Sequence, residues 1–416
     1  MSIRLFLATV LLLAGSATSR QVFETLYEWN LLNYDLPQGS YVPESNLFTG
    51  LEIYWDRIFL ALPNLRSGVP ATLTWLPRPD RAGASYYQQS PALQPYPGLE
   101  WQGTEGNCSG LVSVYRIRVD RCDRLWVLDS GVITTLDNFT PACPPKIFVF
   151  DLKTDRLVRN IVLPKEVLRP NTLLTNLVID YEVVGGIPDR GSLGGFYGFQ
   201  IPRQTCDDAF LYMTDTANAG IVVYDVRKDS AWRVFHPYMI PHPEHCTHIR
   251  LLYFQPFAGL RLYAMPTSVL QTPPGIDTDL QVRLIFEKTS QSASLASDPN
   301  DGTLYFNPIS ELALASLQPG SRHAQILVQD PDRLQFSSDI LVTPRDNFNI
   351  WFVSSKFQQF FRRTYDPHVV NFRIMRIANT HSPTIQTPVI QAPVLHASPS
   401  VATPLHSPYR NPLLYY

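Results

Sequence analysis

The sequence predicts an all-β fold, a six-bladed β-propeller with four-stranded antiparallel blades. Three observations predict it: one hairpin pattern recurs along the 416 residues, amphipathic helical stretches are scarce, and turns rich in Asp, Gly and Asn separate the apolar runs. The clearest hairpin spans residues 113–131. Its alternating first strand leads into the polar turn Asp120-Arg121-Cys122-Asp123, and the apolar run Leu125-Trp126-Val127-Leu128 follows.

The two ends of the chain lack this pattern. Residues 1–20 carry Arg4, an apolar run and then small residues, which is typical of a secretory signal peptide. Residues 380–416 are rich in Pro, Ser, Thr and Val without strand or helix period, so we expect a disordered tail. Residues 21–379 remain for one propeller domain, and no segment there approaches the roughly 18 apolar residues of a membrane span. We therefore expect a secreted, extracellular protein without a membrane partner.

Six segments match the second strand of the hairpin, and each carries an aromatic residue. They are residues 57–60, 125–128, 211–214, 262–265, 304–307 and 350–353. Their irregular but comparable spacing is typical of propeller blades with loop insertions. A β-sandwich also has many short strands, but it does not explain one hairpin pattern repeated six times.

Other strands follow from the same pattern. First strands are predicted at residues 112–119, 176–181, 249–254, 293–296 and 340–343. Third and fourth strands are predicted at 146–151 with 157–163, and at 220–225 with 231–235.

The hairpin also predicts two faces of the ring. The turns between first and second strands lie on one face, which we call the turn face. The start of each first strand and the end of each second strand lie on the other, the rim face. We expect five loops on the rim face: residues 108–113, 129–145, 215–219, 266–277 and 354–367. Loops on a rigid scaffold are where binding usually occurs.

The chain has five cysteines: Cys108, Cys122, Cys143, Cys206 and Cys246. An exported protein should pair most of them. Cys108 and Cys143 both fall on the rim face, so we predict that they pair, whereas the sequence does not choose among the other three. No CxxC pair occurs, so a zinc site is not expected. Asn107 and Asn138 begin N-glycosylation sequons.

Charge and motifs exclude several functions. The net charge of −2 is spread without blocks of like charge, which argues against nucleic acid and anionic membranes as partners. No GxSxG or HExxH motif occurs. Four histidines, His236, His242, His245 and His248, cluster among prolines without ordered ligand spacing. We therefore expect no metal and no cofactor.

Several short motifs resemble the insect yellow and major royal jelly proteins. They are Gly50-Leu51-Glu52, Trp55-Asp56-Arg57, residues 68–73, Pro95-Tyr96-Pro97, Gly106-Asn107-Cys108, residues 113–116 and 124–131, Cys143-Pro144-Pro145 and Asn371-Phe372-Arg373-Ile374. The resemblance runs from about Tyr27 to Ala378. It implies a secreted six-bladed propeller in a family whose members include pigmentation and cuticle proteins, dopachrome-converting proteins, salivary amine binders and nutritional proteins.

One departure from the family concerns the cysteines. The family's blade-five segment usually has Cys-Trp after an Ala, and this chain has Ser316-Leu317 after Ala315. If that family cysteine pairs with the counterpart of Cys206, then Cys206 must pair with Cys246 or stay unpaired.

A ligand site is expected where the central channel opens on the rim face. Polar residues at the starts of inner strands should line it: Asn176, Thr247, His248, Gln291, Ser292, Ser338 and Asp339. The alternative is that they satisfy backbone groups and waters at strand ends. A polar and aromatic mouth would suit a small aromatic amine or catechol-derived ligand. Asp339 would accept the ammonium, and Phe372 or another rim aromatic would supply a cation–π face. Asn371-Phe372, in a family-like motif, is the segment expected to contact the ligand.

Three functions remain open. The chain is a small-molecule binding protein, a dopachrome-converting isomerase, or a structural component of cuticle or eggshell, for which the Pro-rich tail would suit contacts with extracellular matrix. Isomerisation of an aminochrome removes a proton from carbon and returns one to oxygen, which a single base can do. His248 is the candidate base, and Asp339 is its alternative or partner.

Overall fold

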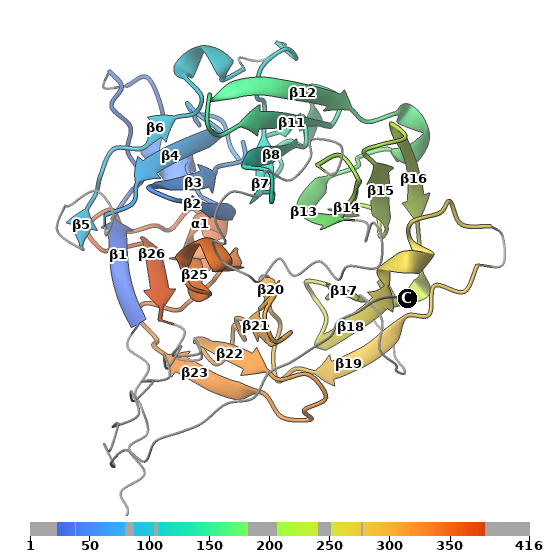
Figure 1. The fold of residues 1–416 in the computed structure, drawn as a ribbon. Helices are drawn as coiled ribbons and strands as arrows, with labels where there is room; N and C mark the ends of the chain where they lie inside the picture. Colours follow the sequence, from blue (N-terminus) through green and yellow to red (C-terminus); the bar gives the residue numbers. More distant parts are fainter. Residues whose placement is uncertain are drawn as a thin grey trace, which may run out of the picture. The chain divides into compact units, whose positions relative to one another are not determined.

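The computed structural model describes residues 23–37, 39–79, 87–103, 107–181, 206–239, 251–275 and 278–378. Six of their seven sheets are arranged as a ring around a central axis (Figure 1), and the seventh is a two-stranded hairpin outside the blades. The predicted six-bladed β-propeller is therefore confirmed. The expected signal peptide and the expected tail lie outside the described residues. The described part of the chain contains no apolar helix long enough to cross a bilayer.

The blades are numbered from the N-terminus, and their strands run antiparallel except for one parallel pair at the outer edge of blade 6. Blade 1 contains β2 (Gly50–Tyr54), β3 (Arg57–Ala61), β4 (Leu73–Pro77) and β6 (Gln94–Pro95), and blade 2 contains β7 (Val114–Val119), β8 (Arg124–Asp129), β11 (Lys146–Asp151) and β12 (Arg156–Val162). Blade 3 contains β13 (Leu174–Tyr181), β14 (Ala209–Asp215), β15 (Ile221–Asp225) and β16 (Ser230–Val234), and blade 4 contains β17 (Leu251–Phe254), β18 (Arg261–Pro266) and β19 (Arg283–Glu287). Blade 5 contains β20 (Leu295–Ser297), β21 (Leu304–Phe306), β22 (Ala313–Leu317) and β23 (Gln325–Gln329).

Blade 6 joins the two ends of the propeller. Its strands are β24 (Ile340–Thr343), β25 (Asn349–Ser355), β26 (Phe372–Ile377), β1 (Phe23–Trp29) and the short β5 (Gln88–Gln89). The N-terminal β1 pairs antiparallel with the C-terminal β26, so a strand from each end closes the ring. Trp29 is fully buried at this closure and donates its indole N–H to the carbonyl of Pro91 at 2.8 Å. The sequence pattern did not predict this strand.

Outside the blades the described elements are short. They are the hairpin β9 (Val132–Ile133) with β10 (Thr140–Pro141), the helix α1 (Phe357–Arg362), and the 3-10 turns η1 (Pro43–Ser45), η2 (Leu99–Trp101), η3 (Lys165–Val167), η6 (Pro237–Met239), η7 (Thr267–Val269) and η8 (Pro344–Asp346).

The aromatic residues of the second strands have a structural role. Trp126 donates its indole N–H to Asp120 at 2.8 Å, and Trp351 does the same to Asp346 at 2.8 Å. In both blades the carboxylate belongs to the turn that precedes the second strand. The buried indole therefore ties the turn to the blade core, because a buried N–H requires an acceptor.

Blade 4 corrects the predicted strand order. Its β17–β18 turn contains Phe257, whose ring lies 6.3 Å from Phe336, and the Phe336 carbonyl accepts the N–H of Ser355 at the rim end of β25. Beyond the other end of β18, Gln271 donates to Asp180 near the turn end of β13. The β17–β18 turn therefore lies on the rim face, where the other five blades have the ends of their second strands.

Two predictions are wrong as a result. Residues 249–254 and 262–265 are not the first and second strands of blade 4. The strands β17, β18 and β19 run in the directions that the second, third and fourth strands have in the other blades. The loop that follows β18, within residues 266–277, runs on the turn face rather than on the rim face. Consecutive hairpins of a meander have the same alternation, so the pattern alone could not tell which pair of strands it marked.

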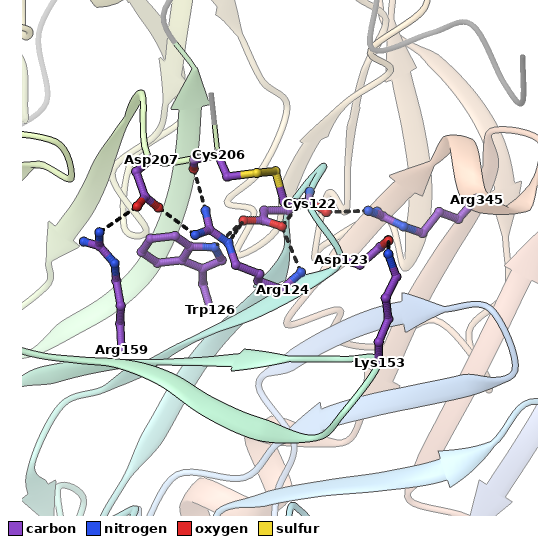
Figure 2. The surroundings of a disulfide bond; sticks show 10 residues. Cys122, Asp123, Arg124, Trp126, Lys153, Arg159, Cys206, Asp207 and Arg345 are labelled. Atoms are coloured by element: carbon purple, nitrogen blue, oxygen red, sulfur yellow. Dashed lines mark hydrogen bonds and ion pairs between the residues drawn. A yellow bond between two sulfur atoms is a disulfide. The ribbon is translucent and has the colours of Figure 1, made fainter. Parts of the chain in front are cut away.

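Two disulfides join the described cysteines. Cys108 pairs with Cys143, as predicted, with Cα atoms 5.5 Å apart. Cys122 pairs with Cys206, with Cα atoms 6.0 Å apart (Figure 2). The family-based expectation that Cys206 pairs with Cys246 or stays unpaired is therefore wrong. Cys122 lies in the β7–β8 turn and Cys206 precedes β14, so both lie on the turn face of neighbouring blades. Cys246 lies outside the described residues.

Candidate functional site

A buried charge network joins the inner strands of three blades. Asp339, just before β24 of blade 6, forms ion pairs with Arg116 at 2.6 Å and Arg118 at 3.1 Å, both on β7 of blade 2. Its carboxylate also accepts the backbone N–H of Leu51 on β2 of blade 1 at 2.9 Å. Blade 1 lies between blades 6 and 2, so these side chains meet at the inner ends of the blades, beside the channel.

The network changes the acidity of its two carboxyl groups. Burial alone would raise the pKa of Asp339, but the charges of Arg116 and Arg118 outweigh burial and lower it. Burial raises the pKa of Glu52, although Arg118 and the backbone N–H groups of Val119 and Ile53 oppose the rise. Asp339 is therefore a weak base whose oxygens are already engaged. This disfavours the roles of general base and ammonium acceptor that the sequence suggested for it.

Most of the other predicted lining residues make local bonds at strand ends. The Asn176 side chain accepts the N–H of Leu177 at 3.0 Å, and the Ser292 hydroxyl donates to the carbonyl of Ser294 at 2.9 Å. Ser338 donates to the carbonyl of Phe48 at 3.0 Å. These contacts agree with the alternative interpretation, in which the side chains satisfy backbone hydrogen-bonding groups at strand ends.

Three predicted residues differ from this group. Gln291 is exposed and donates to the carbonyl of Ala258 at 3.3 Å. Thr247 and His248 lie outside the described residues, so their place at the channel mouth stays a prediction.

Asn371 and Phe372 lie inside the closure of the ring. Asn371 donates to the carbonyls of Asn30 at 2.7 Å and Asp366 at 2.8 Å. The ring of Phe372 has 0 % exposure and packs edge-on against Phe48 and Tyr365. This burial argues against the ligand contact expected for the pair. It indicates that the family-like motif stabilises the closure.

The rim face carries an aromatic cluster that the sequence pattern did not predict. We call Phe257, Phe336, Phe357 and Phe361 the rim aromatic cluster. Phe336 stacks on Phe357 with ring centroids 4.6 Å apart, and Phe357 lies 6.5 Å from Phe361. Phe257 is 51 % exposed and Phe361 is 58 % exposed. The cluster therefore offers solvent-facing aromatic rings from blade 4 and from α1.

One signal for this cluster was present in the sequence. The run Phe357-Gln-Gln-Phe360-Phe361 falls in the predicted rim loop 354–367, where exposed phenylalanines need a reason. Phe257 could not be found, because the predicted strand order of blade 4 placed its turn on the opposite face.

Polar side chains border the cluster. Gln358 on α1 donates to Gln335 at 2.5 Å. Lys356 directly precedes α1, and its pKa is lowered by partial burial and by the charge of Arg373. This part of the rim face thus combines aromatic surface with a few hydrogen-bonding groups, which are the residue types of small-molecule sites.

Both glycosylation sequons have exposed asparagines. Asn107 accepts a bond from the hydroxyl of Ser109 at 2.6 Å, next to the Cys108–Cys143 disulfide. Asn138 lies in the loop between β9 and β10. Glycosylation of either residue stays a prediction.

Comparison with known proteins adds the family. The sequence model of the Major royal jelly protein family matches residues 112–250 and 244–384. The chain belongs to this family. The resemblance drawn from the short motifs is thereby confirmed.

Curated members of the family align over most of the chain. It is 26 % identical to a protein named "Dopaminechrome tautomerase" from Drosophila melanogaster over 407 residues, covering 86 % of this chain and 82 % of that protein. It is 29 % identical to "Protein yellow" of Drosophila subobscura over 418 residues, covering 90 % of this chain and 68 % of that protein. Among solved structures, a luciferin-regenerating enzyme aligns with a TM-score of 0.48 and 10 % identity, covering 87 % of this chain and 96 % of that one.

Proposed function

We propose that this family member is a secreted protein of cuticle or pigmentation biology that binds a small aromatic, catechol-derived ligand at the rim face. The observation that carries the proposal is the rim aromatic cluster, in which Phe257 and Phe361 expose their rings to solvent instead of packing in the core. The name of the relative "Dopaminechrome tautomerase" supports a catechol-derived ligand. The two disulfides support an oxidising, extracellular location.

Removing an exposed ring of the cluster should weaken ligand binding. Phe257→Ala and Phe361→Ala are each expected to cost about 1 kcal/mol of binding free energy, roughly 5-fold in affinity, because a ligand ring loses one aromatic partner. Titration calorimetry with dopamine, serotonin, octopamine and 4-methylcatechol would measure the loss. Val158→Ala is the matched control, because Val158 is an exposed apolar residue on the outer strand β12. Absence of heat with every probe would contradict the proposal and favour a structural role in cuticle or eggshell.

A second candidate function is tautomerisation of an aminochrome, favoured by the name of that same relative. The step removes a proton from a ring carbon and returns one to a quinone oxygen, so the ring gains aromaticity without an external oxidant or reductant. The lowered pKa of Asp339 makes it a poor base, which leaves His248 as the proposed base.

Tautomerase activity is tested by the rate at which purified protein bleaches dopaminechrome. We expect His248→Ala to lower the protein-dependent rate at least 100-fold if His248 is the base. His236→Ala is the control, because it belongs to the same histidine-rich segment. Equal rates for His248→Ala and the unmodified protein would remove this assignment, and a rate equal to the buffer blank would remove the enzymatic function.

A further inference from the structure

Lys288, directly after β19, is a buried lysine that has no counter-charge among the residues that the structure describes. Lys288 is 3 % exposed. Its ammonium donates to the side-chain oxygen of Gln255 at 2.9 Å, and across the described part of the chain no carboxylate comes within ion-pair distance of it. Burying a cation without an anion is costly, so such residues are rare unless they have a function.

The protonation state of Lys288 follows from this burial. Desolvation lowers its pKa to about 8. The side chain is therefore still mostly charged at neutral pH, and it presents a cation inside the rim face.

Gln255 holds the ammonium in a defined place. The amide nitrogen of Gln255 donates to the carbonyls of Ser292 at 3.0 Å and Ser294 at 3.1 Å, so its oxygen is the atom left for Lys288. An ammonium has three N–H donors, and this bond uses one of them. Buried donors are almost always satisfied, so the other two require an acceptor that the described protein groups do not supply. The place beside Lys288 therefore suits an oxygen atom of water or of a ligand.

Lys288 lies beside the turn that carries the rim aromatic cluster. Its backbone N–H donates to the carbonyl of Leu260 at 2.7 Å, in the β17–β18 turn. Gln255 begins this turn and the exposed Phe257 follows two residues later. Lys288 is therefore bonded, through its ammonium and its backbone N–H, to the same turn that carries the exposed ring of Phe257.

We infer that Lys288 is a specificity determinant of the rim site: its ammonium binds an oxygen of the aromatic ligand and disfavours a protonated amine at that position. The inference rests on the proposed function, since it takes the rim aromatic cluster as the place where the ligand ring binds. The acceptor is a carboxylate or an oxygen on the ring, and both present lone pairs to the two free N–H groups. The site thus selects acidic or neutral catechol derivatives over cationic catecholamines.

Three catechols of different charge test this selection by titration calorimetry: 3,4-dihydroxyphenylacetate, 4-methylcatechol and dopamine. The unmodified protein is expected to bind the acid at least 10-fold more tightly than dopamine. Lys288→Met is expected to weaken binding of the acid by about 10- to 100-fold, the range for a bond to a charged group, and to leave dopamine binding equal or tighter. A parallel loss with 4-methylcatechol identifies a ring oxygen as the acceptor, and no loss with it identifies the carboxylate.

The controls separate this inference from the proposed function. Lys153→Met removes an exposed lysine and should change no affinity. If Lys288→Met binds all three probes as the unmodified protein does, the role of Lys288 is overturned while the rim site stands. If no probe binds the unmodified protein, both are overturned. Lys288→Met should fold with an equal or higher Tm, because it removes an unpaired buried charge; Lys288→Gln is the second variant if it does not.

Discussion

Replacing Cys122 and Cys206 together by serine will lower the free energy of unfolding by about 4–5 kcal/mol. The disulfide closes a loop of 84 residues, and the entropy that such a cross-link removes from the unfolded chain grows with the logarithm of loop length. Urea unfolding of the secreted protein, followed by tryptophan fluorescence, would measure the change. This is the larger of the two disulfide effects that we expect.

Hydrogen bonds and ion pairs also fix the turn around Cys122 in the folded state, independently of the disulfide. Cys122 donates its N–H to Asp120 at 2.8 Å, Arg124 pairs with Asp120 at 2.7 Å and with Asp207 at 2.6 Å, and Arg345 donates to the Asp120 carbonyl at 2.5 Å (Figure 2). The disulfide therefore acts mainly on the unfolded state. The double variant should keep the ligand affinities of the rim face, because that network remains.

The Cys108–Cys143 pair provides the comparison. Its loop spans 35 residues, so the same relation predicts a loss about 0.8 kcal/mol smaller than for Cys122–Cys206. An equal or larger loss on removing Cys108–Cys143 would show that loop entropy does not control the two effects.

Replacing Asp339 by asparagine is expected to cost about 3–5 kcal/mol of unfolding free energy. The substitution keeps the shape of the side chain but leaves Arg116 and Arg118 buried without their anion. Breaking a buried ion pair from one side is far more costly than the net value of the pair, because the remaining charge stays desolvated. Lys153→Ala is the control: its pair with Asp123 is exposed, so the loss should stay below about 1 kcal/mol.

The pH dependence of stability gives a second measurement on Asp339. Its folded pKa is lowered, so its contribution is present above its ordinary pKa and is lost as pH falls through the lowered value. The unmodified protein should therefore lose stability below about pH 4, and the difference from Asp339→Asn should shrink there. A difference that stays constant down to pH 2 would show that Asp339 does not titrate with unfolding.

The rim aromatic cluster and the charge network have different parts in the molecule. The network ties blades 6, 1 and 2 together beside the channel, and its members have protein partners. The rim aromatic cluster, by contrast, exposes aromatic surface to solvent, and the Lys288 ammonium has N–H donors to which the described protein groups provide no acceptor. A search for ligand binding should therefore begin at the β17–β18 turn and α1, on the blade 4 and blade 6 sectors of the rim face.

Much of the scaffold followed from local pattern. The second-strand segments at Trp126, Tyr212 and Trp351 were identified correctly, because alternation and polar turns are properties of a few adjacent residues. The Cys108–Cys143 pair also followed, since strand direction alone assigns both residues to one face. The candidate site was harder to predict from the sequence. Ser292 and Phe372 have the residue types of a binding site, yet in the structure Ser292 bonds at a strand end and Phe372 packs in the core.

The amino-acid sequence by itself determined the β-hairpin pattern, the number of blades and the two faces of most of them. Only the tertiary structure decided how the ring closes through β1 and β26, which strands blade 4 uses, and which partner Cys122 takes. These features depend on contacts between residues far apart in the chain, and no local periodicity records such contacts. The same reason explains why the place of Phe257 beside Phe336, and hence the site proposed here, became visible only in the folded chain.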